Sequence, residues 1–122
     1  MVSSATSLTR SGLSDFILQR VTAVVLALYT VCIVGFLLVS GEVDHASWTA
    51  FHGSTAMRLF STLAVLSTAA HAWIGMWTVG TDYIRSHYFG KRATVWRGLY
   101  QLVCAGALFL YVAWGLQIFW RL

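Results

Sequence analysis

Three long apolar stretches, separated by short polar segments, dominate the hydrophobic pattern of this 122-residue chain. They run from about Ile17 to Val39, from about Met57 to Val79 and from about Val95 to Ile118. A helix needs roughly 20 residues to cross about 30 Å of hydrocarbon, and each stretch reaches that length. The pattern therefore predicts an all-α membrane protein with three transmembrane helices, at about 15–40, 56–84 and 94–120.

Composition supports a single membrane-anchor domain over residues 1–122. Hydrophobic residues make up 58% of the chain and charged residues 10%, and the mean hydropathy is +0.72. Such a chain is too apolar to keep its surface wet as a soluble domain. The polar segments are too short for a second folded domain, and the absence of proline removes the usual cause of a kink. We expect continuous helices that pack with a partner, because three helices enclose little interior.

Basic residues are unevenly distributed around the three stretches. Six lie within residues 1–20 or in the 80–97 segment, namely Arg10, Arg20, Arg85, Lys91, Arg92 and Arg97. The other two are Arg58 and Arg121. By the positive-inside rule, the N-terminus and the 80–97 segment face the cytoplasm, while the C-terminus lies outside. The net charge of +4 thus reflects membrane orientation and not a nucleic-acid surface.

Local signals predict the ends of the helices. Ser14 or Asp15 is a candidate N-cap of the first helix and Thr94 of the third, because their side-chain oxygens can accept from unpaired backbone N–H groups. The Ser- and Thr-rich residues 1–12 are expected to be loosely ordered or held by a partner.

The segment between the first two stretches is interpreted as an outer loop, residues 41–53. It contains His45, His52 and Trp48. The two histidines are seven residues apart and form no tight ligand pattern, so both are expected to be solvated or interfacial. Trp48 is explained as an interfacial aromatic residue.

His71 is the strongest candidate for a functional residue, because an ionisable side chain inside hydrocarbon is costly unless something compensates it. Small and polar residues share its helix face: Ser67, Gly75, Thr78 and Asp82. Small neighbours one turn away leave room for a flat macrocycle or for another helix. Three interpretations stay open on spacing alone: axial ligation of haem iron, helix packing and a proton relay. No other histidine lies inside a predicted span, so a second axial histidine would come from another subunit.

Asp82 and Tyr83 end the second stretch, roughly 16 to 18 Å along the helix axis from His71. A tyrosine at this position is commonly an interfacial residue with its hydroxyl among the headgroups. A phenol beside a carboxylate is also suited to hold a quinone carbonyl, because the hydroxyl donates a hydrogen bond while the ring stays among apolar groups.

Several runs of residues together resemble the hydrophobic membrane anchor, the D subunit, of bacterial succinate dehydrogenase (respiratory complex II). The resemblance is carried by Asp15–Arg20, Tyr29, Val34-Gly35-Phe36, Ser40-Gly41-Glu42, His71-Ala72-Trp73-Ile74-Gly75-Met76-Trp77 and Thr81-Asp82-Tyr83. It covers the first two helices in register and continues more weakly through the third.

The resemblance implies a membrane subunit of succinate:ubiquinone oxidoreductase in the bacterial inner membrane. Its expected partners are a cytochrome b-type C anchor subunit, an iron–sulfur subunit, a flavoprotein subunit and lipid. Carried over by position, His71 is the axial ligand of haem b shared with the C subunit, and Arg20 lies near the haem propionates. Tyr83 hydrogen-bonds ubiquinone, and Asp82 is its neighbour in that pocket.

Two features depart from the pattern of this family. Ser14 stands where similar anchors carry a histidine, and the segment 86–96 is longer and more basic than in compact members. We expect Lys91 and Arg92 either to mark an ordinary cytoplasmic loop or to grip the iron–sulfur subunit. Alternative functions are the anchor of a quinol:fumarate reductase, or a non-catalytic membrane assembly protein whose His71 only packs.

Overall fold

The computed structural model describes residues 12–84 and 90–121, and this part of the chain is helical without any strand. The long helices are α1 (Leu13–Ser40), α3 (Thr55–Tyr83) and α5 (Ala93–Trp120). A short helix, α2 (His45–Gly53), joins α1 to α3, and a 3-10 turn, η1 (Gly90–Arg92), precedes α5. Within these residues, three helices are long and apolar enough to cross a membrane, which confirms the predicted all-α fold with three membrane-spanning helices.

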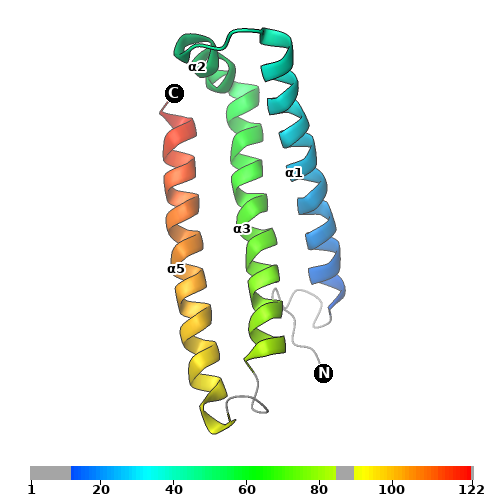
Figure 1. The fold of residues 1–122 in the computed structure, drawn as a ribbon, viewed down its shortest axis with the longest axis vertical. Coiled ribbons are helices and arrows are strands. Elements are labelled where there is room, and N and C mark those ends of the chain that lie inside the picture. The colour runs from blue at the N-terminus through cyan, green and yellow to red at the C-terminus, as the bar shows by residue number, and fades with distance from the viewer. Residues whose placement is uncertain (1–11, 85–89, 122) are drawn as a thin grey trace.

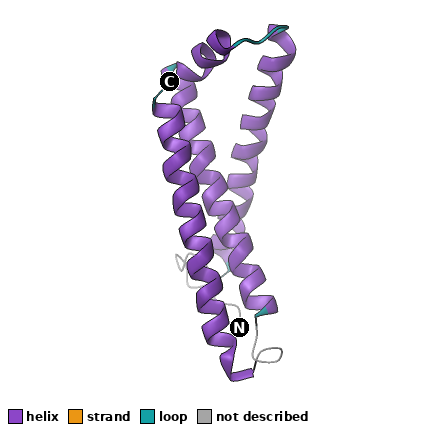
Figure 2. Ribbon diagram, turned by 60° about the vertical axis from the view of Figure 1, so that its left-hand side comes forward, coloured by secondary structure: helices purple, strands orange, loops and turns teal. Residues whose placement is uncertain are grey.

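Helix α3 lies between α1 and α5 and packs against both (Figure 1). Helix α1 begins, and α3 ends, at one end of this arrangement, which we call the Tyr83 end. Figure 2, which is turned by 60° from the view of Figure 1, shows α5 running alongside α3, with α2 across the opposite end. At about 1.5 Å per residue, helices of 28 or 29 residues are roughly 42 to 44 Å long, longer than the hydrocarbon core. Both ends therefore extend into the interfacial region.

Small side chains mediate the packing of the central helix. Ser61, Ala64, Val65 and Ser67 of α3 are each 5% exposed or less. On α5, a Cβ atom added to Gly115 would lie 3.2 Å from a methyl carbon of Val65, so the glycine allows the two helices to approach closely. Small residues at interfaces are the usual means of packing helices in lipid, where apolar side chains gain little by leaving an apolar solvent.

Polar contacts between helices supplement this packing. The Tyr29 hydroxyl of α1 lies 2.7 Å from the hydroxyl of the fully enclosed Ser61. The indole N–H of Trp120 donates to Thr62 Oγ1 at 2.9 Å and joins the end of α5 to α3. Such bonds average well under a kcal/mol in membranes, but they fix which faces meet.

The predicted outer loop is wrong in part, because residues 45–53 form helix α2. Asp44 begins it with a capping box: its side chain accepts from the Ser47 N–H at 2.8 Å, and Ser47 Oγ accepts from the Asp44 N–H at 3.1 Å. These hydrogen bonds lower the pKa of Asp44. Phe51 stacks on Phe36 of α1 with ring centroids 4.0 Å apart. Local capping and aromatic contacts thus make this segment helical.

The predicted N-caps are also wrong. Gly12 precedes α1 without a side-chain cap, and Ser14 lies within the first turn at 8% exposure. Arg92 precedes α5, so Thr94 is already helical and does not cap it. Helices α1 and α5 begin two residues and one residue earlier than expected, because Gly12 and Arg92, ahead of the capping candidates, already have helical backbone. Except for Gly12, the expectation for residues 1–12 lies outside the described residues.

Candidate functional site

His71 occupies the middle of α3 and faces α1. Its Nδ1 lies 3.1 Å from Oγ1 of Thr22, which is 4% exposed. The Thr22 hydroxyl is also 2.8 Å from the carbonyl oxygen of Leu18 and 3.1 Å from that of Gln19. Within the described residues the structure gives the imidazole no hydrogen bond at Nε2. The imidazole is half-buried, with Nδ1 held by α1 and the opposite nitrogen available to another group.

A cavity of about 290 Å³ opens between α1 and α3 on the Tyr83 side of His71. Gly75, one turn from His71, lines it, and nothing lies within 4 Å of a Cβ atom added there. The open space therefore lies one helical turn from His71, which does not itself line the cavity. The complete lining is Gly12, Asp15, Phe16, Gln19, Arg20, Ile74, Gly75, Trp77, Thr78 and Thr81.

Arg20 brings a positive charge to this cavity. Its guanidinium lies over the Phe16 ring, 4.9 Å from the centroid, and the side chain is otherwise exposed. Asp15 lines the same cavity and supplies the opposite charge. Gln19 Oε1 is buried there without a hydrogen-bond partner in the described chain. The structure thus brings Arg20 into the α1–α3 groove, next to the face that carries His71.

The predicted polar stripe of α3 is divided between different surroundings. Ser67 is buried at 5% exposure, whereas Thr78 and Asp82 are exposed. The Trp73 and Trp77 rings, one turn apart on α3, lie 5.9 Å from each other. Of the stripe, Gly75 and Thr78 line the cavity, whereas Ser67, His71 and Asp82 do not.

Asp82 and Tyr83 form the last turn of α3, and both side chains are exposed, Tyr83 by 68%. Neither lines the cavity next to His71. The Arg97 guanidinium of α5 donates to the carbonyl oxygen of Ile84 at 2.7 and 3.2 Å. This bond pairs a cation with a helix C-terminus and holds α5 against the turn that carries Tyr83.

The basic connecting segment is shorter than the sequence suggested. Residues 93–96 belong to α5, and Arg97 is bound to the end of α3. Lys91 and Arg92 are exposed in η1. Residues 85–89 lie outside the described residues, so the expectation for residues 86–89 is not examined by the structure.

His52 is enclosed, so of the two alternatives expected for it, solvated or interfacial, the structure excludes the solvated one. It is 3% exposed, and its ring lies 4.3 Å from that of Trp48 and 5.8 Å from that of Phe119 of α5. Neither ring nitrogen has a hydrogen-bond partner in the described chain. Burial lowers the pKa of His52 below its ordinary value of 6.5. His45, by contrast, is exposed as expected.

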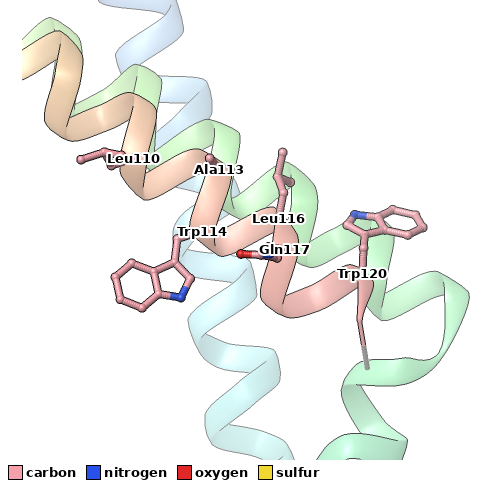
Figure 3. Close-up of a pocket in the computed structure, with 6 residues that line it drawn as sticks. All are labelled: Leu110, Ala113, Trp114, Leu116, Gln117 and Trp120. Carbon is pink, nitrogen blue, oxygen red and sulfur yellow. The ribbon is translucent and has the colours of Figure 1, made fainter.

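A separate hollow of about 760 Å³ lies on α5 near its C-terminal end (Figure 3). All of its lining residues come from this one helix: Leu110, Ala113, Trp114, Leu116, Gln117 and Trp120. None of these described residues has an ionisable side chain, and Trp114 projects away from the helix axis. Despite its size, this surface fits lipid or a neighbouring helix better than a reaction site.

Comparison with known proteins connects this geometry to a family. Residues 2–114 match the family described as succinate dehydrogenase/fumarate reductase transmembrane subunit. The chain belongs to this family. A relative from Coxiella burnetii (strain RSA 493 / Nine Mile phase I), named succinate dehydrogenase hydrophobic membrane anchor subunit, is 34% identical over 111 residues. The match covers 91% of this chain and 90% of the relative.

As a member of the succinate dehydrogenase/fumarate reductase family, the chain is a membrane-anchor subunit of an oxidoreductase complex. Sequence reasoning missed the contact of Thr22 with His71 and the bond of Arg97 to the Ile84 carbonyl oxygen. A signal for Thr22 was present, because Thr22 and Tyr29 are polar, seven residues apart and hence on one face of an otherwise apolar helix. Arg97 carried no such signal, since its charge was already explained by the positive-inside rule.

Proposed function

We propose that this chain anchors succinate dehydrogenase in the bacterial inner membrane, binds haem b jointly with a C anchor subunit, and forms part of the ubiquinone-reduction site. The observation that carries the proposal is the position of the His71 imidazole, whose Nδ1 contacts Thr22 and whose Nε2 has no hydrogen-bond partner among the described residues. The named relative from Coxiella burnetii supports succinate dehydrogenase as the complex.

The residues around His71 fit a haem group. With the ring proton on Nδ1, Nε2 would offer a lone pair of the kind that binds haem iron. Gly75 leaves open space one turn away, and Arg20 supplies a cation for an anionic propionate. Bound haem would supply one-electron redox chemistry inside the membrane. The protein's part is to hold the imidazole, place the positive charge and exclude water from the groove.

The last turn of α3 would bind ubiquinone at the interface with the partners. The Tyr83 hydroxyl would donate to a quinone carbonyl, and Asp82 would orient the phenol or help to deliver protons. Reduction to the quinol consumes two electrons, delivered from succinate through the flavoprotein and iron–sulfur subunits, and two protons. Because Tyr83 is 68% exposed in this chain, the remaining walls of the site would come from those partners.

Substituting His71 and Tyr83 separately tests the two halves of this proposal. We expect His71→Ala to alter the reduced b-type haem spectrum of the purified complex, whereas His45→Ala, at an exposed position of α2, leaves it unchanged. An unchanged spectrum and unchanged axial-ligand signals in His71→Ala would refute the ligand assignment.

We expect Tyr83→Phe to preserve assembly and haem but to slow quinone reduction by roughly 10- to 100-fold, because one hydrogen bond to the substrate is lost. Tyr111→Phe on the exposed face of α5 is the control. Wild-type turnover in Tyr83→Phe would return this residue to a purely interfacial role.

The exposed cations of η1 would bind the iron–sulfur subunit. We expect the double variant Lys91→Gln and Arg92→Gln to lower the amount of intact complex seen on native gels. Arg121→Gln, at the opposite end of α5, should leave that amount unchanged. Full assembly of the double variant would show that these residues serve only membrane orientation.

A further inference from the structure

We propose that Thr22 is a positioning residue for the haem ligand: its hydroxyl accepts the Nδ1–H hydrogen bond of His71, fixes the tautomer that presents Nε2 to iron, and lowers the haem reduction potential. This inference rests on the proposed haem binding, and it assigns a role to a residue of α1 that has no contact with iron itself.

The direction of the hydrogen bond follows from the other contacts of the Thr22 hydroxyl. The group has one proton, and the Leu18 and Gln19 carbonyl oxygens, which can only accept, lie 2.8 and 3.1 Å from it. The shortest contact takes the proton. The Gln19 carbonyl can only share that same proton, because it has none to donate. At the third contact, 3.1 Å from His71 Nδ1, the oxygen therefore accepts and Nδ1 carries the hydrogen.

A neutral imidazole has a single ring proton. With that proton on Nδ1, the lone pair of Nε2 is free, which is the arrangement that histidine ligands adopt when their second nitrogen is hydrogen-bonded. The contact joins two helices, so it also fixes the rotation of the imidazole relative to α1. Because Thr22 is 4% exposed, water does not compete for the bond.

An acceptor at Nδ1–H increases the electron density of the imidazole and favours the ferric state. Loss of the acceptor should therefore raise the haem midpoint potential. Partners of this kind typically change metal affinity or activity by 10- to 100-fold. For a neutral hydroxyl we expect a change of about threefold to tenfold in the ferric-to-ferrous equilibrium, the upper value corresponding to about 59 mV for one electron.

Redox titration of the purified complex tests the proposal with matched threonine variants. Thr22→Val keeps the shape of the side chain but removes the acceptor, so its haem potential should rise. Thr22→Ser keeps the hydroxyl and should restore the wild-type value. Thr30→Val is the control, because Thr30 makes the same type of bond, 2.8 Å to the Leu26 carbonyl, at an exposed position of α1.

Low-temperature electron paramagnetic resonance on the same samples should show changed axial-ligand signals in Thr22→Val alone. If Thr22→Val impairs assembly, Thr22→Ala supplies a less bulky substitution for the same titration. The role of Thr22 would be overturned if Thr22→Val and Thr30→Val had the same haem potential and the same axial-ligand signals. It would also be overturned if Thr22→Ser did not return the haem potential to the wild-type value.

A measurement without haem separates this inference from the proposed function. Histidine ¹⁵N chemical shifts of the complex, produced in cells that cannot make haem, should place the His71 proton on Nδ1 in the wild type and shift it toward Nε2 in Thr22→Val. An Nε2–H tautomer in the wild type would overturn the inference. A wild-type complex lacking a b-type haem spectrum would instead refute haem binding and leave the tautomer assignment standing.

Discussion

The buried imidazole of His52 should destabilise the docking of α2 in its present position. Both ring nitrogens are enclosed without partners in the described chain, and the side chain is 3% exposed. An unsatisfied buried polar group costs about 1 to 3 kcal/mol, whereas an apolar group of the same shape carries no such cost. We therefore expect His52→Phe to stabilise docked α2 by about 1 to 2 kcal/mol. Next to His52 is a cavity of about 370 Å³, which offers room for the slightly larger ring.

Hydrogen exchange of the α2 backbone amides, measured by mass spectrometry on the complex in lipid nanodiscs, reports this local equilibrium. A stabilisation of 1 to 2 kcal/mol corresponds to roughly 5- to 30-fold slower exchange. His45→Phe is the matched control, because His45 lies in the same short helix but is exposed. Its effect on exchange should be small.

His52→Phe should also remove a pH dependence of the docking of α2. Since the pKa of docked His52 lies below 6.5, the undocked form binds more protons between the two pKa values. Docking is therefore fully stable above about pH 6.5 and loses stability as the pH falls toward the lowered pKa. His52→Phe, compared with wild type at each pH, should abolish this loss. Faster exchange in His52→Phe would refute the reasoning, because it would mean that the imidazole nitrogens are hydrogen-bonded in the membrane.

Two further predictions concern the helix contacts. Gly115→Val should weaken the packing of α5 on α3, because its Cβ would lie 3.2 Å from a side-chain carbon of Val65. Gly106→Val is the control and should be tolerated, because nothing lies within 4 Å of a Cβ atom at that position. Thermal dissociation of the complex in detergent measures both variants, and equal midpoint temperatures would refute the contact. Asp44→Ala should speed amide exchange in α2, and Asp44→Asn, an equally good N-cap, should not. Because the hydrogen bonds from Ser47 lower the pKa of Asp44, the cap is fully formed above pH 3.8 and weakens as the pH falls through the lowered pKa. Unchanged amide exchange in Asp44→Ala would show that the cap is dispensable.

Hydrophobic pattern alone determined the three long helices of this protein and placed His71 inside one of them. The ends were predicted within two residues, since a membrane span must be apolar over a length fixed by the bilayer. The run from His71 to Tyr83 also carried enough specific residues to indicate the family, which the comparisons confirm. The assignments of haem to His71 and quinone to Tyr83 stay predictions.

Only the tertiary structure decided what these residues touch. The bond between His71 and Thr22 joins positions 49 residues apart, and the bond between Arg97 and Ile84 crosses from one helix to the next. The enclosure of His52 likewise depends on Phe119 of α5. A periodic pattern shows which residues share a helix face, but the rotation and pairing of helices are set by small-residue packing among many similar apolar surfaces. That physical ambiguity is why the helices could be predicted from sequence and their contacts could not.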